Sequence, residues 1–248
     1  MTNFLDPAIL FFIFGVFAGL VKSNLEIPQP IARFLSLYLL MALGLKGGFA
    51  LHKSGFTIEI ALALGLAIFL AILVPLMGYL ILRSRLNSFD AAAIAATYGS
   101  VSAVTFITAT QVLGQYGVEY GGHMAAAMAL MESPAIILAI LLANKARAES
   151  TQNKQSPGLS NILHESFTDG AQLLLLGSMV VGLVSGDAGQ KLMAPFSIDL
   201  FKGMLAFFLL DMGLMAAKNF EGLKGKPPIT VLYAILAPLL HATIALGL

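Results

Sequence analysis

The sequence contains neither cysteine nor tryptophan, and it has few charged residues. Without cysteine the chain can form no disulfide, no thiolate metal site and no iron–sulfur cluster. Only 11% of its 248 residues are charged, whereas a soluble globular domain carries about 25%. The net charge of +1 gives no basis for nucleic-acid binding. Because 58% of the residues are hydrophobic and the mean hydropathy is +0.88, we expect an integral membrane protein.

Apolar segments divide the chain into expected membrane crossings. A crossing helix needs about 20 apolar residues, and fewer where neighbouring helices shelter its ends. We therefore predict an all-α polytopic membrane protein. The eight expected crossings are residues 7–21, 28–46, 57–82, 89–113, 120–144, 169–185, 196–217 and 229–248.

Lysine and arginine are distributed unequally between the two sides of these crossings. The side opposite the N-terminus receives ten of the 14 basic residues. Cytoplasmic loops carry the excess of basic residues, so we expect the N-terminus outside the plasma (inner) membrane. The polar stretch 145–168, rich in Ser, Asn, Gln and Lys, then becomes a cytoplasmic linker.

Short matches between the two halves of the chain suggest an internal repeat. Residues 40–48 align with 209–217, and residues 74–82 align with 237–245. Such short Gly-Leu and Pro-Leu matches also arise by chance in apolar sequence. If they are a repeat, each unit holds five helices, an odd number, so the second unit is inverted as in many secondary transporters.

The repeat predicts how the chain is organised. Residues 1–144 form the first five-helix repeat, 145–168 the linker, and 169–248 a partial second repeat that is truncated after its third helix. Because the counterparts of the fourth and fifth helices are missing from this sequence, we expect that the 248-residue chain expressed as it stands does not carry out coupled transport.

The expected fourth helix contains a run that disfavours regular helix. Its residues are Gly99, Ser100, Val101, Ser102, Ala103, Val104 and Thr105. Glycine, serine and β-branched residues weaken a helix interior, so we predict a break between about Tyr98 and Thr105. The second half-helix then offers free amides to an anion, and the hydroxyl groups can also bind a small hard cation. The alternative is a straight helix whose small residues permit close packing.

Three ionisable residues are expected within the membrane. Glu132, which precedes Pro134 by two positions, is a candidate ligand for a coupling cation. Asp211 and His241 are second-tier candidates. The alternative for each is a structural side chain that bonds to a neighbouring helix. The sequence contains no HExxH, GxSxG or P-loop motif, so we expect neither an enzyme nor a bound cofactor.

Four stretches together resemble the sodium-dependent bicarbonate transporters, the family of SbtA-type permeases. They are TYGSVSAVTF (97–106), MESPAIILAILLANK (131–145), DMGLMA (211–216) and APLLHATIALGL (237–248). Each stretch alone is a weak match, but they occur in the expected order over most of the chain.

The resemblance implies Na⁺-coupled bicarbonate uptake by a homotrimer with an inverted five-plus-five fold. It implies that Gly99, Ser100, Ser102 and Thr105 line the anion and sodium sites, with Na⁺ as the coupling ion. It also implies a possible PII-like regulator on the cytoplasmic face. Two alternatives remain: a Na⁺- or H⁺-coupled carrier of another small anion or carboxylate, and a non-transporting truncated membrane subunit.

Overall fold

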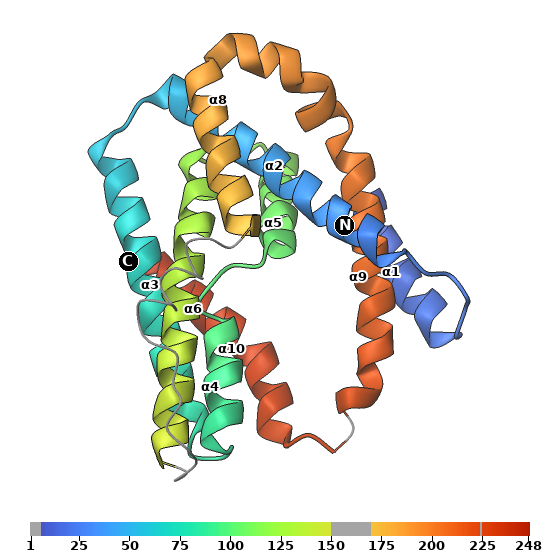
Figure 1. The fold of residues 1–248 in the computed structure, drawn as a ribbon, viewed down its shortest axis with the longest axis vertical. Coiled ribbons are helices and arrows are strands. Elements are labelled where there is room, and N and C mark those ends of the chain that lie inside the picture. Colours follow the sequence, from blue (N-terminus) through green and yellow to red (C-terminus); the bar gives the residue numbers. More distant parts are fainter. Residues whose placement is uncertain (1–5, 150–169, 224) are drawn as a thin grey trace. The chain divides into compact units, whose positions relative to one another are not determined.

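The computed structural model describes residues 6–149, 170–223 and 225–248 (Figure 1). No strand occurs in these ranges, and the predicted all-α class is confirmed. The helices are α1 (Pro7–Leu20), α2 (Gln29–Ser54), α3 (Ile58–Leu82), α4 (Ser88–Thr97), α5 (Ala103–Gln115), α6 (His123–Glu149), α8 (Gly170–Ala194), α9 (Phe201–Asn219) and α10 (Pro228–Leu246), with a π-helical turn η2 (Pro195–Asp199) and a 3₁₀ turn η3 (Phe220–Leu223).

Most of the helices can cross a membrane by length and composition. Within the described ranges, five helical runs qualify: α2, α3, residues His123–Leu142 of α6, the run Gly170–Asn219 that contains α8 and α9, and α10. α1 is a shorter apolar helix. The predicted crossing 89–113 is divided between α4 and α5. The chain is a multi-pass membrane protein whose helices follow the predicted order.

The predicted ends of the second and fifth crossings are wrong. The second crossing does not end at residue 46, because α2 continues to Ser54 and ends before Gly55, which has a φ of +69°. Gly47 and Gly48 are buried, so they allow close packing inside the helix instead of ending it. The predicted linker also begins too early, since α6 continues to Glu149. Residues 150–168 of the linker lie outside the described residues.

The chain forms two compact units, each made of segments that are distant in sequence. The first unit comprises residues 1–55, 107–122 and 174–226, and the second comprises 56–106, 123–173 and 227–248. These units are defined by contacts, whereas the predicted division into 1–144, 145–168 and 169–248 concerns a repeat and remains a prediction.

In the first unit, α1 packs along α9 through small residues. A Cβ added at Gly15 would lie 3.2 Å from the Cα of Gly213, and one added at Gly19 would lie 2.5 Å from the Cβ of Ala217. The residue numbers rise together along both helices, so the pair is parallel. Small residues four positions apart let membrane helices approach closely, which explains why α1 has glycine at these positions.

α2 and α8 make the same kind of contact. A Cβ added at Gly44 would lie 2.8 Å from the Cβ of Ser178, and one added at Gly48 would lie 2.9 Å from the Cα of Gly182. This pair is also parallel. If crossings alternate in direction, α1 and α9 are the first and seventh, and α2 and α8 are the second and sixth, so both parallel pairs agree with the predicted order of crossings.

The two helix pairs share one register. Gly44 and Gly48 of α2 have the same spacing as the α9 residues 213 and 217, so one constant added to both numbers relates the two pairs. In the same way, one constant relates Gly15 and Gly19 of α1 to the α8 residues 178 and 182. The first unit therefore contains one contact made twice. The predicted repeat requires this pattern for its first two helices, and its inverted sense stays a prediction.

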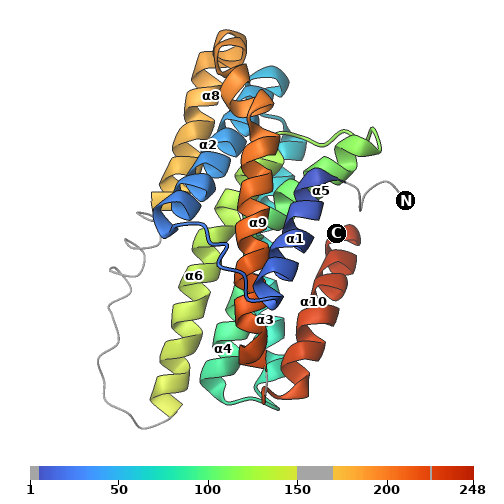
Figure 2. The same cartoon turned by 90° about the vertical axis from the view of Figure 1, so that its right-hand side faces the viewer.

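The second unit is built from α3, α4, α6 and α10. α3, α4 and α6 pack against one another, as Figure 2 shows, and α10 contacts α3. Alanines on one side of α4 permit this close packing. One buried hydrophobic cluster of this unit consists of Tyr79, Leu82, Ala91, Ala92, Ala95, Leu142, Tyr233 and Ala237.

Candidate functional site

The predicted helix break is confirmed. α4 begins at a well-formed cap, in which the Asn87 side chain accepts a hydrogen bond from the Asp90 amide at 2.9 Å. It ends at Thr97, where the Tyr98 amide bonds back to the Ala95 carbonyl at 3.2 Å. Helix resumes at Ala103 in α5. The chain between these helices is not helical, so the helix of the expected fourth crossing, 89–113, is interrupted near its middle.

Gly99 fixes the break against the second unit. The residue is buried, and an added Cβ would lie 2.5 Å from Cγ of Pro75 on α3 and 2.8 Å from Cβ of Ala135 on α6. It would also lie 3.0 Å from the carbonyl oxygen of Ala71. Real Cβ atoms do not approach neighbours so closely without displacing them. Glycine is therefore needed at this position for space.

Beyond Gly99 the break becomes accessible. Ser100 is half-buried, Val101 is 38% exposed, and Ser102 and Thr105 are exposed. The Ser102 carbonyl accepts the first α5 hydrogen bond from the Phe106 amide at 2.9 Å. The amides at the start of α5 thus follow the break directly, as the anion-site interpretation requires. The side chains of Ala103 and Val104 lie outside the described part of the chain.

A pocket of about 460 Å³ lies within the second unit beside the break. Tyr98 and His241 supply its polar side chains, and Val101 of the break and Phe106 of α5 also line it. Its other lining residues are apolar and come from α3, α6 and α10: Ala63, Leu66, Ala67, Leu70, Val74, Met124, Ala127, Met128, Met131, Ala242 and Ala245.

Three rings connect the break to α10. The Tyr98 ring meets the Tyr233 ring edge to face at 5.2 Å between centroids, and it meets the His241 ring at 5.7 Å. Tyr233 and His241 are 6.5 Å apart. The Tyr233 hydroxyl reaches the surface of α3 at Gly78, where an added Cβ would overlap it. The structure thus brings the second-tier candidate His241 to the site through Tyr98.

Sequence reasoning missed Tyr98 and Tyr233 as parts of this site. Tyr98 adjoins the glycine of the break, and Tyr233, Ala237 and His241 follow one another every four residues on α10. That spacing places all three on one helix face. A tyrosine and a histidine two turns apart on a crossing helix could have predicted that this helix face lines a polar site.

The remaining predicted residues belong to different units. Glu132 is half-buried on α6, one turn before Ala135, which lies against the position of Gly99. Asp211 is 9% exposed and lies on α9 of the first unit, so it is not among the residues that the second unit assembles. The structure does not test whether either carboxylate binds a cation.

The described residues contain no group of three or more His, Asp or Glu side chains that could hold a metal ion. These residues offer hydroxyl groups, backbone carbonyls and carboxylates as oxygen ligands for a cation. Such hard oxygen ligands suit alkali cations. The break contributes such oxygen atoms through its serine and threonine side chains and its non-helical carbonyls.

No curated protein matches the chain. Residues 7–248 match the family described as the Na⁺-dependent bicarbonate transporter superfamily. This match covers nearly the whole chain, including the break, the ring cluster and all the helices described above. The chain therefore belongs to the Na⁺-dependent bicarbonate transporter superfamily.

Proposed function

We propose that this protein is a secondary active transporter that couples bicarbonate uptake to Na⁺ across the plasma membrane. Membership of the superfamily supports a transporter role. The assignment of the site rests on the interruption between Thr97 and Ala103. Gly99 packs against the second unit at the start of this interruption, and the exposed Ser102 lies at its end. A broken helix is the usual substrate site of secondary transporters.

The anion would bind at the start of α5. The N-terminus of a helix carries a partial positive charge and amides without intrahelical partners, which attract an anion. Ser100 and Ser102 can add hydroxyl donors to the same ion. Non-helical backbone at membrane depth is tolerated only where it faces protein or a water-filled cavity, and the exposed Ser102 would have to face such surroundings to bind an ion.

Na⁺ would bind beside the anion. The same hydroxyl oxygens, particularly those of Ser100, Ser102 and Thr105, can act as cation ligands. Glu132 would supply the negative charge that makes the site favour a cation, since α6 approaches the break at Ala135. Binding both ions in one place lets the Na⁺ gradient drive anion uptake. We propose Na⁺ as the coupling ion and no other cofactor.

Binding and uptake measured together test this proposal. The purified chain should be stabilised by bicarbonate only when Na⁺ is present, because ligand binding raises the melting temperature. Any uptake of labelled bicarbonate into cells that lack their own transporter should require a Na⁺ gradient. Na⁺-dependent binding without uptake would identify a non-transporting membrane subunit. Absence of both would refute the proposal.

A matched pair of serine variants locates the site. Ser102→Ala should weaken bicarbonate binding about 10- to 100-fold, because a hydrogen bond to a charged group contributes about 1.5–3 kcal/mol. Ser84→Ala is the control, since this exposed serine of the second unit bonds to the Ile81 carbonyl at 2.9 Å. Equal binding by both variants would remove Ser102 from the site.

A second candidate substrate class is favoured by the pocket. Bicarbonate has no apolar surface, yet the pocket beside the break is lined mainly by Leu, Ala, Met and Phe. A small carboxylate with an aliphatic tail would place its tail there and its carboxylate at the break, with Na⁺ or H⁺ as the coupling ion. Short-chain monocarboxylates should then compete with labelled bicarbonate, with inhibition that increases with tail length.

Assembly and orientation are also proposals. We propose a homotrimer, an outside N-terminus, and a cytoplasmic linker at 145–168 that is available to a PII-like regulator. The mass of the purified complex tests the trimer. A cysteine introduced at Ser156, in a chain that otherwise has none, should resist an impermeant thiol reagent in intact cells. Rapid labelling there would reverse the orientation.

A further inference from the structure

The α8 helix of the first unit is kinked at one residue. Gly186 has φ +56° and ψ −144°, outside the helical region, and helix continues on both sides of it. This conformation suits glycine, since a side chain there is strained. In a straight helix the Asp187 amide would donate to the Leu183 carbonyl, four residues earlier. The kink turns that amide away and leaves the carbonyl without its helical partner.

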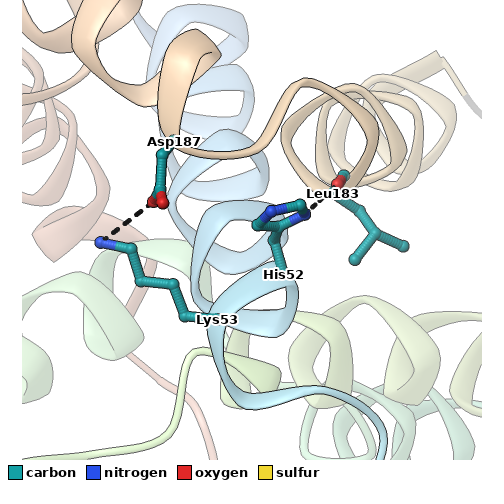
Figure 3. Close-up of polar contacts among 4 residues, drawn as sticks. All are labelled: His52, Lys53, Leu183 and Asp187. Atoms are coloured by element: carbon teal, nitrogen blue, oxygen red, sulfur yellow. Dashed lines mark hydrogen bonds and ion pairs between the residues drawn. The ribbon is translucent and has the colours of Figure 1, made fainter.

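The end of α2 supplies a replacement donor. Nδ1 of His52 lies 2.9 Å from the Leu183 carbonyl oxygen, as Figure 3 shows. Because a carbonyl can only accept, Nδ1 carries the proton and donates. The imidazole also lies directly on the kink, since a Cβ added at Gly186 would be 2.6 Å from Nε2. One side chain thus satisfies the freed carbonyl and covers the residue that frees it.

His52 continues the contact between α2 and α8. Gly44, Gly48 and His52 follow one another every four residues on α2, so they lie on one face. The two glycines bring the helices together, and His52 lies where α8 bends. At the third position of this face the chain has His52 instead of another small residue. Its larger side chain ends the close contact between α2 and α8 and contacts the bend.

Lys53 makes a weaker connection beyond the kink. Its Nζ lies 3.7 Å from Oδ1 of Asp187, the residue that follows Gly186 (Figure 3). Both side chains are more than half exposed, at 55% and 69%. Exposed ion pairs contribute little. His52 is therefore the principal contact across the kink, and Lys53 a secondary one.

We propose that α8 has two conformations and that His52 selects the bent one. In the bent conformation the Leu183 carbonyl accepts from His52, and in the straight conformation it accepts from the Asp187 amide. One hydrogen bond replaces the other, so the two conformations differ little in hydrogen-bond number. His52 is a positioning residue in this device, and the segment from Asp187 to α9 is the part that it moves.

A pair of spin labels tests the proposal without measuring transport. Since the chain has no cysteine, Gly177→Cys and Leu192→Cys give specific labelling sites. Gly177 has open space around it and Leu192 is 80% exposed. A straight helix would separate the two backbones by about 22 Å. The protein with His52 should give a shorter distance, and His52→Leu should lengthen it towards the straight-helix value.

Two matched variants identify the cause. His52→Asn places an amide donor close to the position of Nδ1, so it should keep the short distance. Lys53→Gln should also keep it. If His52→Leu leaves the distance unchanged, the proposal is wrong. If His52→Asn lengthens it as much as His52→Leu does, ring packing rather than hydrogen bonding holds the bend, which also contradicts the proposal.

Hydrogen exchange gives a second measurement if the leucine variant is not recovered. His52→Ala then replaces it, and amide exchange is followed for residues 187–194. The Asp187 amide should become more protected when His52 is removed, because it regains the Leu183 carbonyl. Faster exchange throughout this segment would show simple unfolding instead of straightening and would overturn the two-conformation proposal.

Discussion

The two units interrupt a helix in different ways. In the second unit, the break between Thr97 and Ala103 leaves Ser102 and Thr105 exposed. In the first unit, the kink at Gly186 is covered by the imidazole of His52, which donates to the freed carbonyl. Where a side chain of the protein bonds to the carbonyl that an interruption frees, the interruption serves to change the direction of the helix. An interruption that leaves polar groups accessible can bind a ligand.

The glycines at the two interruptions are needed for different reasons. Gly99 is needed for space, because Pro75 and Ala135 lie where its Cβ would be. Gly186 is needed mainly for its conformation, since its φ of +56° is unfavourable for any residue with a side chain. Substitutions at the two glycines can therefore separate crowding from conformation.

Replacing Gly99 by valine should have the largest effect on stability. The added atoms would overlap α3 and α6 together, so we expect Gly99→Val to lower the free energy of unfolding by about 3 kcal/mol. Denaturant unfolding of the purified protein measures this. Gly65→Val is the control, because Gly65 is an exposed α3 residue with open space around it. A similar loss in both variants would argue against crowding at Gly99.

Double variants distinguish the two kinds of glycine. Gly99→Ala should cost about 1–3 kcal/mol, and Pro75→Ala should recover part of this by removing the nearest atom. Gly186→Ala should cost about 1–2 kcal/mol, and His52→Ala should recover part of it, because it removes the nearest atoms and lets α8 straighten. Recovery together with the longer spin-label distance of a straight helix would show that conformation is the main requirement at Gly186, and recovery at an unchanged distance would show that Gly186, too, is required for space.

The carboxylates of the two units should differ in their effect on Na⁺ dependence. Glu132→Gln should raise the Na⁺ concentration for half-maximal activation about tenfold, because a charged ligand near the break is lost. Asp211→Asn, in the first unit, should leave it unchanged. The readout is bicarbonate-induced stabilisation measured over a range of Na⁺ concentrations. The reverse result would transfer the cation role from Glu132 to Asp211.

Removing only the hydroxyl group of Tyr98 should have the smallest effect. Tyr98→Phe keeps both ring contacts and should change the free energy of unfolding by less than about 0.5 kcal/mol. Tyr98→Ala removes the contacts with Tyr233 and His241, each worth about 0.5–1.5 kcal/mol beyond the buried area. Unfolding measurements on the two variants test this order. If Tyr98→Phe weakens bicarbonate binding, the hydroxyl itself contacts the substrate.

The break could be predicted because its cause is local. Gly99, Ser100 and Ser102 weaken a helix wherever they occur together in its interior, and the chain does leave the helical conformation there. The kink at Gly186 was indicated only in part. The predicted sixth crossing ends at residue 185, immediately before the kink, but the helical residues 187–194 beyond it were not expected.

Features that depend on distant partners could not be predicted. Gly48 has the same local properties as a helix-ending glycine, and only the surface of α8 shows that it permits packing inside α2. Likewise, Tyr233 becomes part of the site through Tyr98, which is far away in the sequence. A single sequence contains no information on which apolar face meets which, so these partners emerge only from the structure.

The pairing of α1 with α9 has a consequence for biogenesis. Gly15 faces Gly213, so α1 leaves the translocon long before its partner exists. At about 5–20 residues per second, synthesis of the intervening 200 residues takes roughly 10–40 s. During that time the small-residue face of α1 is exposed to lipid and can meet other helices in the same membrane. We expect the first unit to assemble late, and truncated nascent chains to keep α1 accessible to crosslinking until α9 has been inserted.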